Sequence, residues 1–204
     1  MTAANNSEPI DERRTSFRIS PPPGVVREIA VWFRSPSGDR VLPLTVLGKP
    51  DLVSRNGNGS VTLENSSSVG VALRVPHAFL PPPGTWEGAF LYIYLKLASP
   101  LPGKYTTVSL FLGAAVVSLS TDRRDTRLHC RLVQRGTPDT AKKSLTMFSI
   151  ERAGVKELTV WGDEILRMGR GILPPISPGL NLEYLLDEIE HLETPSSPTQ
   201  EPTA

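Results

Sequence analysis

Residues 126–134 read Thr126-Arg127-Leu128-His129-Cys130-Arg131-Leu132-Val133-Gln134 and alternate between hydrophobic and basic side chains. Because successive side chains of a β-strand point to opposite faces of a sheet, this pattern predicts a strand with two different faces. The hydrophobic row consists of Leu128, Cys130 and Leu132. The basic row on the other face consists of Arg127, His129 and Arg131. Cys130 is therefore expected to be a small buried hydrophobe and not a reactive thiol.

Short hydrophobic stretches recur from residue 16 to about residue 161. Each is rich in Val, Ile, Thr, Leu or aromatic residues and is bounded by Gly, Pro, Asn or Asp. Their spacing predicts a mainly β fold over residues 16–178, either an antiparallel sandwich or a partly open barrel. Pro43 lies inside one stretch and is expected to place it at a sheet edge or to split it. The expected strands are 26–33, 40–47, 60–64, 69–75, 89–97, 105–112, 115–120, 126–134, 145–150 and 156–161.

The two ends of the chain have different characters. Residues 1–15 are polar, mixed in charge and without periodicity, which predicts a disordered N-terminal arm. Residues 179–193 place apolar side chains at steps of three and four with acids between them, which predicts a C-terminal amphipathic helix. This helix is expected either to pack on its own sheet or to contact another subunit. The contact residues would be Leu182, Leu185, Leu186 and Ile189, and residues 194–204 would form a disordered tail.

Two kinds of loop stand out between the expected strands. Residues 55–60 read Arg-Asn-Gly-Asn-Gly-Ser and predict a hairpin turn, since Asn and Gly tolerate positive φ. Residues 21–24 and 81–84 both read Pro-Pro-Pro-Gly. They are expected to be stiff spacers or, alternatively, a proline motif recognised by a partner.

No motif in the sequence predicts catalysis. The only cysteine is Cys130, and His77, His129 and His191 are far apart in the chain, so no metal-ligand spacing arises. Nucleophile elbows, phosphate loops and dinucleotide glycine fingerprints are absent from the sequence. We therefore expect a protein without enzymatic activity, without a cofactor and without a small-molecule substrate. No stretch is long and apolar enough to span a bilayer, which predicts a cytosolic or nuclear protein, or one made in the cytosol and recruited to a surface.

The net charge of +1 conceals an uneven distribution. Residues 174–204 contain six acids and no Lys or Arg, so the rest of the chain carries +7. A basic body with an acidic tail fits a protein that binds a polyanion while its tail competes for the same surface. The alternative is a soluble protein with solvated charges. The expected anionic-surface site consists of Arg123, Arg124, Arg127, Arg131, Arg135, Lys142 and Lys143, and its ligand would be lipid headgroups or RNA.

A second alternating stretch, residues 89–97, separates aliphatic from aromatic side chains. Phe90, Tyr92 and Tyr94 share one face of this expected strand. They would form a self-association or partner surface, where Tyr is enriched, or they would be buried under another part of the fold.

The order of several short segments resembles the core of rhabdovirus matrix proteins. Residues 27–33 and 38–44 are more loosely similar to the opening of bornavirus matrix proteins. The segments that carry the first resemblance are Trp86, Leu91-Tyr92-Ile93, Lys104-Tyr105, Leu110-Phe111-Leu112-Gly113-Ala114, His129-Cys130 and Glu157-Leu158-Thr159.

This resemblance implies a self-assembling viral matrix protein of the virion and host cytoplasm. Such a protein is a homo-oligomer that binds the inner membrane leaflet and the viral ribonucleoprotein. The resemblance also implies a position in the cytoplasm, peripheral at the inner face of a membrane. The chain departs from the family pattern in its N-terminal arm, which is not rich in lysine, and in Pro81-Pro82-Pro83, which is followed by Gly84 and not by Tyr. The alternative function is a capsid-type shell or an accessory interaction module that does not bind lipid.

Overall fold

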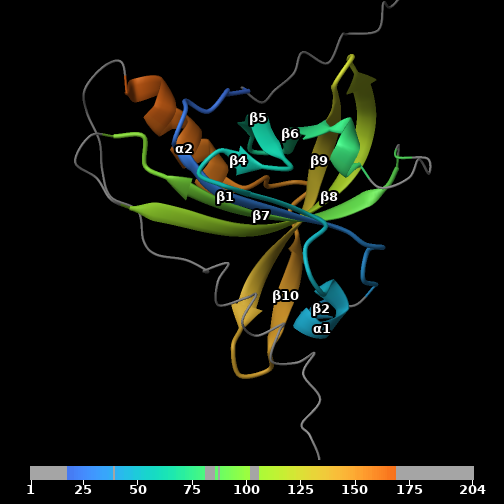
Figure 1. The fold of residues 1–204 in the computed structure, drawn as a ribbon. Coiled ribbons are helices and arrows are strands. Elements are labelled where there is room, and N and C mark those ends of the chain that lie inside the picture. Colours follow the sequence, from blue (N-terminus) through green and yellow to red (C-terminus); the bar gives the residue numbers. More distant parts are fainter. Residues whose placement is uncertain (1–17, 39, 81–85, 87, 102–105, 169–204) are drawn as a thin grey trace, which may run out of the picture.

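The computed structural model describes residues 18–38, 40–80, 86, 88–101 and 106–168. Within these residues the fold is mainly β, as predicted, and consists of one large, open antiparallel sheet followed by a helix (Figure 1). The helices are α1 (Leu44–Leu47), the 3-10 helix η1 (His77–Phe79) and α2 (Lys156–Arg167). The strands are β1 (Val26–Phe33), β2 (Val41–Pro43), β3 (Leu52–Arg55), β4 (Asn58–Gly59), β5 (Thr62–Ser67), β6 (Gly70–Pro76), β7 (Phe90–Ala98), β8 (Thr107–Thr121), β9 (Asp125–Asp139) and β10 (Ser144–Ser149).

Strand β9, which contains the predicted strand 126–134, is the branch point of the sheet. It pairs with β8 on one edge; on the other edge its first half pairs with β6 and its second half with β10. The strand order is β2-β10-β9-β8-β7-β1-β3-β4, and β5 extends the branch by pairing with β6. The alternating stretch therefore positions three neighbouring strands at once.

Strand β8 is one continuous strand where the sequence predicted two. The predicted break falls at Gly113 and Ala114, and the structure has a register shift against β9 at this point. Glycine suits such a bulge, and a Cβ at Gly113 would lie 2.8 Å from Cζ of Phe90. The glycine thus marks a local bend in a long strand and not a turn between two strands.

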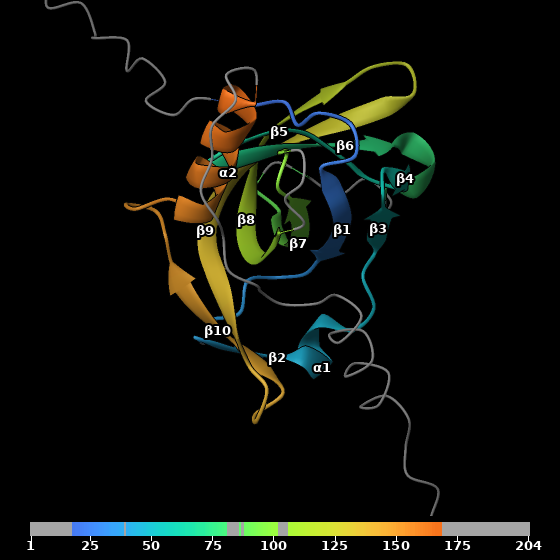
Figure 2. The same cartoon turned by 90° about the vertical axis from the view of Figure 1, so that its left-hand side faces the viewer.

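Two hydrophobic cores lie on opposite faces of the sheet. Ile29 and Val31 of β1 point into the first core, whereas Ala30 and Trp32 point into the second. The first core is closed by α2, whose Trp161 is buried and donates its indole N–H to the Ala98 carbonyl at 2.9 Å. The second core is covered by β2, α1 and β10, which lie together at the end of the molecule opposite α2 (Figure 2).

Helix α2 occupies residues 156–167, where a strand was predicted for 156–161, and this prediction was wrong. The adjacent β-branched residues Thr159 and Val160 suggested a strand. The burial follows helical spacing instead, because Leu158, Trp161 and Gly162 are buried and Thr159 and Val160 are exposed. The separate helix predicted for 179–193 lies outside the described residues, as do the predicted disordered ends at 1–15 and 194–204.

The turn chemistry of the sequence is confirmed at two places. Pro43 splits the stretch 40–47 into β2 and α1, since it ends the strand and directly precedes the helix. Asn56 and Gly57, with φ of 50° and 81°, connect β3 to β4 as predicted for the hairpin. Strand β3 itself was not predicted, because four residues give too short a pattern.

Candidate anion-binding face

The alternation of residues 126–134 has the predicted structural consequence. Leu128, Cys130 and Leu132 are buried in the first core, while Arg131 on the other face is exposed and His129 is half-buried. Burial raises the pKa of the Cys130 thiol to about 12, so the thiol remains protonated at ordinary pH. Cys130 therefore packs in the first core as a small buried side chain.

The sheet places Arg131 in a row that crosses four chain segments. Gly70 of β6 is the register partner of Arg131, and Ser67 of β5 is the partner of Gly70. Beside β5, Ile19 and Ser66 exchange two backbone hydrogen bonds of 2.9 Å, which sets Arg18 next to Ser67 in the antiparallel register. We call Arg18, Ser67, Gly70 and Arg131 the outer row.

The residues next to the outer row explain its orientation. Val71 and Cys130 are buried in the first core, so their strand neighbours Gly70 and Arg131 belong to the opposite face. Ser67, the neighbour of Ser66, is itself only 6% exposed, so the exposed side chains of the outer row are Arg18 and Arg131. Ile19 packs against α2, because a Cβ at Gly162 would collide with Cδ1 of Ile19. Arg18, one position earlier, is exposed. Both arginines thus lie on the outer face of the sheet.

The middle of the outer row has no large side chain, and hydrogen bonds hold its backbone turn. The Ser67 hydroxyl accepts the backbone N–H of Gly70 at 3.1 Å and donates to the Gly70 carbonyl at 3.2 Å, which fixes the β5–β6 turn. Gly70 has no side chain, and a Cβ there would lie 2.9 Å from the Cys130 carbonyl oxygen. The two arginines therefore flank a floor without large side chains. Among the described residues, no carboxylate forms an ion pair with Arg18 or Arg131.

A partly neutralised cluster continues the same face toward the β8–β9 turn. The Glu64 carboxylate binds Arg74 at 2.6 Å and Arg127 at 2.8 Å, and its hydrogen bond raises the pKa of Arg74. His129 lies between this cluster and Arg131, with Nε2 3.3 Å from the Ser120 hydroxyl. Arg127, which the sequence placed in the anion site, is thus already paired within the chain.

Arg135 does not share this face, although the sequence grouped it with Arg127 and Arg131. The register shift between β8 and β9 places one extra residue, Val133, on β9 and reverses the alternation. Arg135 consequently pairs with Leu112, a first-core residue, and its guanidinium forms a 2.5 Å ion pair with Glu157 of α2. The predicted single cationic surface is divided at this bulge.

The remaining predicted cations lie at the two hairpin tips, at opposite ends of β9 (Figure 1). Arg123 and Arg124 are exposed in the β8–β9 turn, where Asp122 accepts the backbone N–H groups of Arg124 and Asp125 at 2.9 Å. These hydrogen bonds lower the pKa of Asp122. Lys142 and Lys143 lie in the β9–β10 turn, where Lys142 is 3.3 Å from Asp139.

The predicted aromatic surface is largely taken up by the second core. Tyr92 and Tyr94 are fully buried, and Phe90 is half-buried with its ring 5.1 Å from that of Tyr92. The Tyr92 hydroxyl accepts the Ser37 N–H at 2.9 Å, and Tyr94 donates to the Ser109 hydroxyl at 3.3 Å. The two tyrosines are therefore buried, which was the alternative to a self-association surface. The other predicted partner residues, Leu182, Leu185, Leu186 and Ile189, lie outside the described residues.

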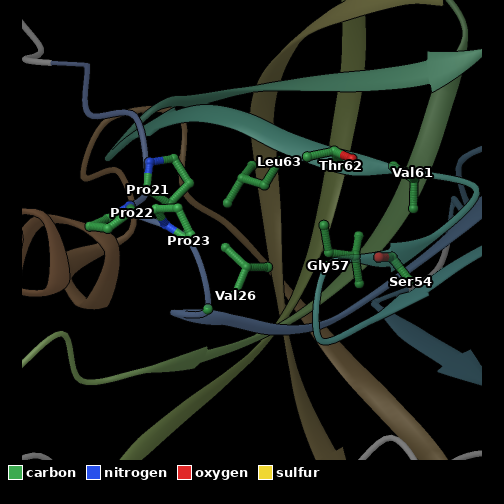
Figure 3. Close-up of a pocket in the computed structure, with 11 residues that line it drawn as sticks. Pro21, Pro22, Pro23, Val26, Ser54, Gly57, Val61, Thr62 and Leu63 are labelled. Carbon is green, nitrogen blue, oxygen red and sulfur yellow. The ribbon is translucent and has the colours of Figure 1, made fainter.

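A cavity of about 250 Å³ lies elsewhere in the fold, between the first described residues, β1 and β5. Figure 3 shows Pro21, Pro23, Val26 and Leu63 around it, and its lining is mostly apolar. Such a lining offers an anion almost nothing to bind. The described residues also hold no group of His, Cys, Asp and Glu side chains suited to a metal ion, and no described helix could cross a membrane.

Sequence reasoning missed Arg18, Ser67 and Gly70. Arg131 could be predicted from the alternation of hydrophobic and basic residues in its own strand. The other members of the outer row join it only through the register of β5, β6 and the segment at Ile19. No local pattern in a single sequence encodes that register.

Comparison with known proteins leaves the family open. No protein-family model matches the chain, and no curated protein matches it. Among solved structures, the chain is similar to the Bacillus subtilis inhibitor of motility (MotI/DgrA), with 15% sequence identity and a TM-score of 0.36. The similarity covers 59% of this chain and 43% of that chain, so this chain spans less than half the length of that protein.

Proposed function

We propose that this protein is a non-enzymatic binding protein that recognises phosphate groups of a small ligand on the outer row. The observation that carries the proposal is the pair Arg18 and Arg131, which flanks Ser67 and Gly70 and has no carboxylate partner among the described residues. Guanidinium groups bind phosphate through two parallel hydrogen bonds, which makes arginine the preferred residue for such contacts.

The distribution of the other cations favours a compact ligand over an extended surface. Arg127, Arg135 and Lys142 already form ion pairs within the chain. Binding to an anionic membrane gains about 1 kcal/mol for each cation near the surface, so it requires many cations in one plane. The expected cations are divided between the outer face, the face toward α2 and two distant tips, so that requirement is poorly met.

The dimensions of the outer row suit a ligand of nucleotide size. Arg18 and Arg131 are separated by three steps between neighbouring strands, or about 14 Å between Cα atoms at the usual spacing. Two extended arginine side chains over this span would bind one central phosphate group or two phosphate groups of the same molecule. The Gly70 floor between them leaves the space that such a molecule would occupy.

The proposal is tested by comparing Arg131→Gln with Arg135→Gln, two arginines of one strand on opposite faces. Binding of pyrophosphate, mononucleotides and dinucleotides to the full-length chain is measured by isothermal titration calorimetry. We expect R131Q to weaken binding about tenfold or more, because a charge-assisted contact contributes about 1.5–3 kcal/mol. R135Q should bind like the wild type.

Two further probes identify the class of ligand. A short RNA and vesicles containing phosphatidylserine are offered to the same three proteins. If they bind and the small phosphates do not, the compact-ligand proposal is wrong and the extended anionic surface predicted from the sequence replaces it. Equal loss of binding in R131Q and R135Q would show that the outer row is not the site.

A further inference from the structure

The acidic segment 183–193 complements the outer row in charge. It contains Glu183, Asp187, Glu188, Glu190 and Glu193 without a single Lys or Arg, whereas the chain before residue 174 carries +7. This segment lies outside the described residues. The composition makes it the chain's own candidate for an anionic occupant of a cationic site.

The helix that precedes the segment contacts the residue next to Arg18. Ile19 packs on α2 at Gly162, so Arg18 lies beside this helix, as the blue start of the described chain does in Figure 1. The helix ends at Arg167, about 8 Å farther along its axis at the usual rise per residue. From there to residue 183 the chain is long enough to span about 50 Å when extended, which exceeds the width of the outer row several-fold.

We infer that the acidic segment 183–193 occupies the outer row when no ligand is bound, and that it competes there with phosphate. An attached segment acts at an effective concentration of the order of millimolar, so contacts that are individually weak are sufficient. Arg135 of β9 and Lys142 of the β9–β10 turn are less available to it, because both are already paired with carboxylates. The competition with ligand rests on the proposed function, whereas occupation of the row does not.

Occupation is tested without any ligand by paramagnetic NMR on the full-length chain. A nitroxide label is attached to Ser196→Cys, and labelling is selective because Cys130 is buried with its pKa raised to about 12. At low salt we expect broadening of the amide signals of Ser67, Gly70 and Arg131, but not of Lys142 at the far hairpin. The broadening should fade at 1 M salt, where the screening length falls to about 3 Å.

Two sets of substitutions show whether the carboxylates cause the contact. The combined change E183Q, D187N, E188Q and E190Q should abolish the broadening, whereas the control E201Q, which neutralises an acid outside the segment, should leave it intact. Broadening that survives the four substitutions, or that is absent from the outer row at low salt, would overturn the inference.

Titration with pyrophosphate separates this inference from the proposed function. If both hold, the four substitutions should tighten pyrophosphate binding about threefold to tenfold, the range expected from a few exposed ion pairs. Outer-row broadening without binding of any phosphate probe would refute the proposed function and leave the tail contact standing. Phosphate binding that is unchanged by the four substitutions would refute the competition and leave the proposed function standing.

Discussion

At the scale of single residues, neighbours along β9 have unrelated roles. Cys130 is buried in the first core, and its neighbour Arg131 is exposed in the outer row. Their difference follows from the alternation of the strand, which the sequence alone predicts. Arg127 and Arg135 show the limit of such reasoning. Their ion-pair partners are Glu64 of β5 and Glu157 of α2, and no local sequence pattern predicts these pairs.

The buried thiol predicts a specific loss of stability at alkaline pH. Cys130 has a folded-state pKa of about 12 against an ordinary value of 9.0, because burial disfavours the thiolate. Between these values the unfolded chain releases the proton and the folded chain retains it, so stability falls as pH rises above about 9. Below pH 9 this contribution to stability is fully present.

Urea unfolding of the wild type and Cys130→Ala between pH 7 and 11 measures this effect. We expect the wild type to lose more free energy of unfolding over that range than C130A, since the other titrating groups are common to both proteins. Parallel pH profiles would contradict the burial of the thiol.

At the scale of elements, the bulge in β9 and the position of α2 determine the site. The bulge at Val133 turns Arg135 away from Arg131, and α2 holds Ile19 so that Arg18 joins the outer row. The sequence predicted most strands, but it assigned part of α2 to a strand. The reason is physical: Thr159 and Val160 are β-branched, and their preference is overridden by the burial of Leu158 and Trp161.

The contact between α2 and Ile19 predicts an unusual response to Gly162→Ala. In an ordinary helix interior this change stabilises by about 1 kcal/mol. Here the added Cβ meets Cδ1 of Ile19, the movable end of a flexible side chain, so we expect the usual stabilisation to be reduced or lost while the phosphate affinity stays unchanged.

Thermal unfolding and pyrophosphate titration of G162A check this prediction. Val160→Ala, at an exposed position of the same helix, is the control and should change stability by no more than about 0.5 kcal/mol. A full stabilisation of G162A by about 1 kcal/mol would show that Ile19 does not pack on α2 at this position.

At the scale of the whole molecule, two hydrophobic cores lie on opposite faces of one sheet. The second core takes up Tyr92 and Tyr94, which the sequence offered as a self-association surface. Self-assembly through the leucine-rich segment 179–193, and with it the viral matrix role, stays a prediction. The fold class followed from strand spacing and turn chemistry, but the outer row depends on pairings between segments as far apart as residues 18 and 131.

The proposed phosphate-binding row consists of Arg18 and Arg131 on either side of Ser67 and Gly70. Titration of the isotope-labelled full-length chain with pyrophosphate, followed by amide chemical shifts, tests it most directly. The largest shifts are expected at Ser67, Gly70 and Arg131, with little change at Arg124 or Lys142 on the hairpin tips. Shifts concentrated at those tips, or spread evenly over all exposed cations, would contradict the proposal.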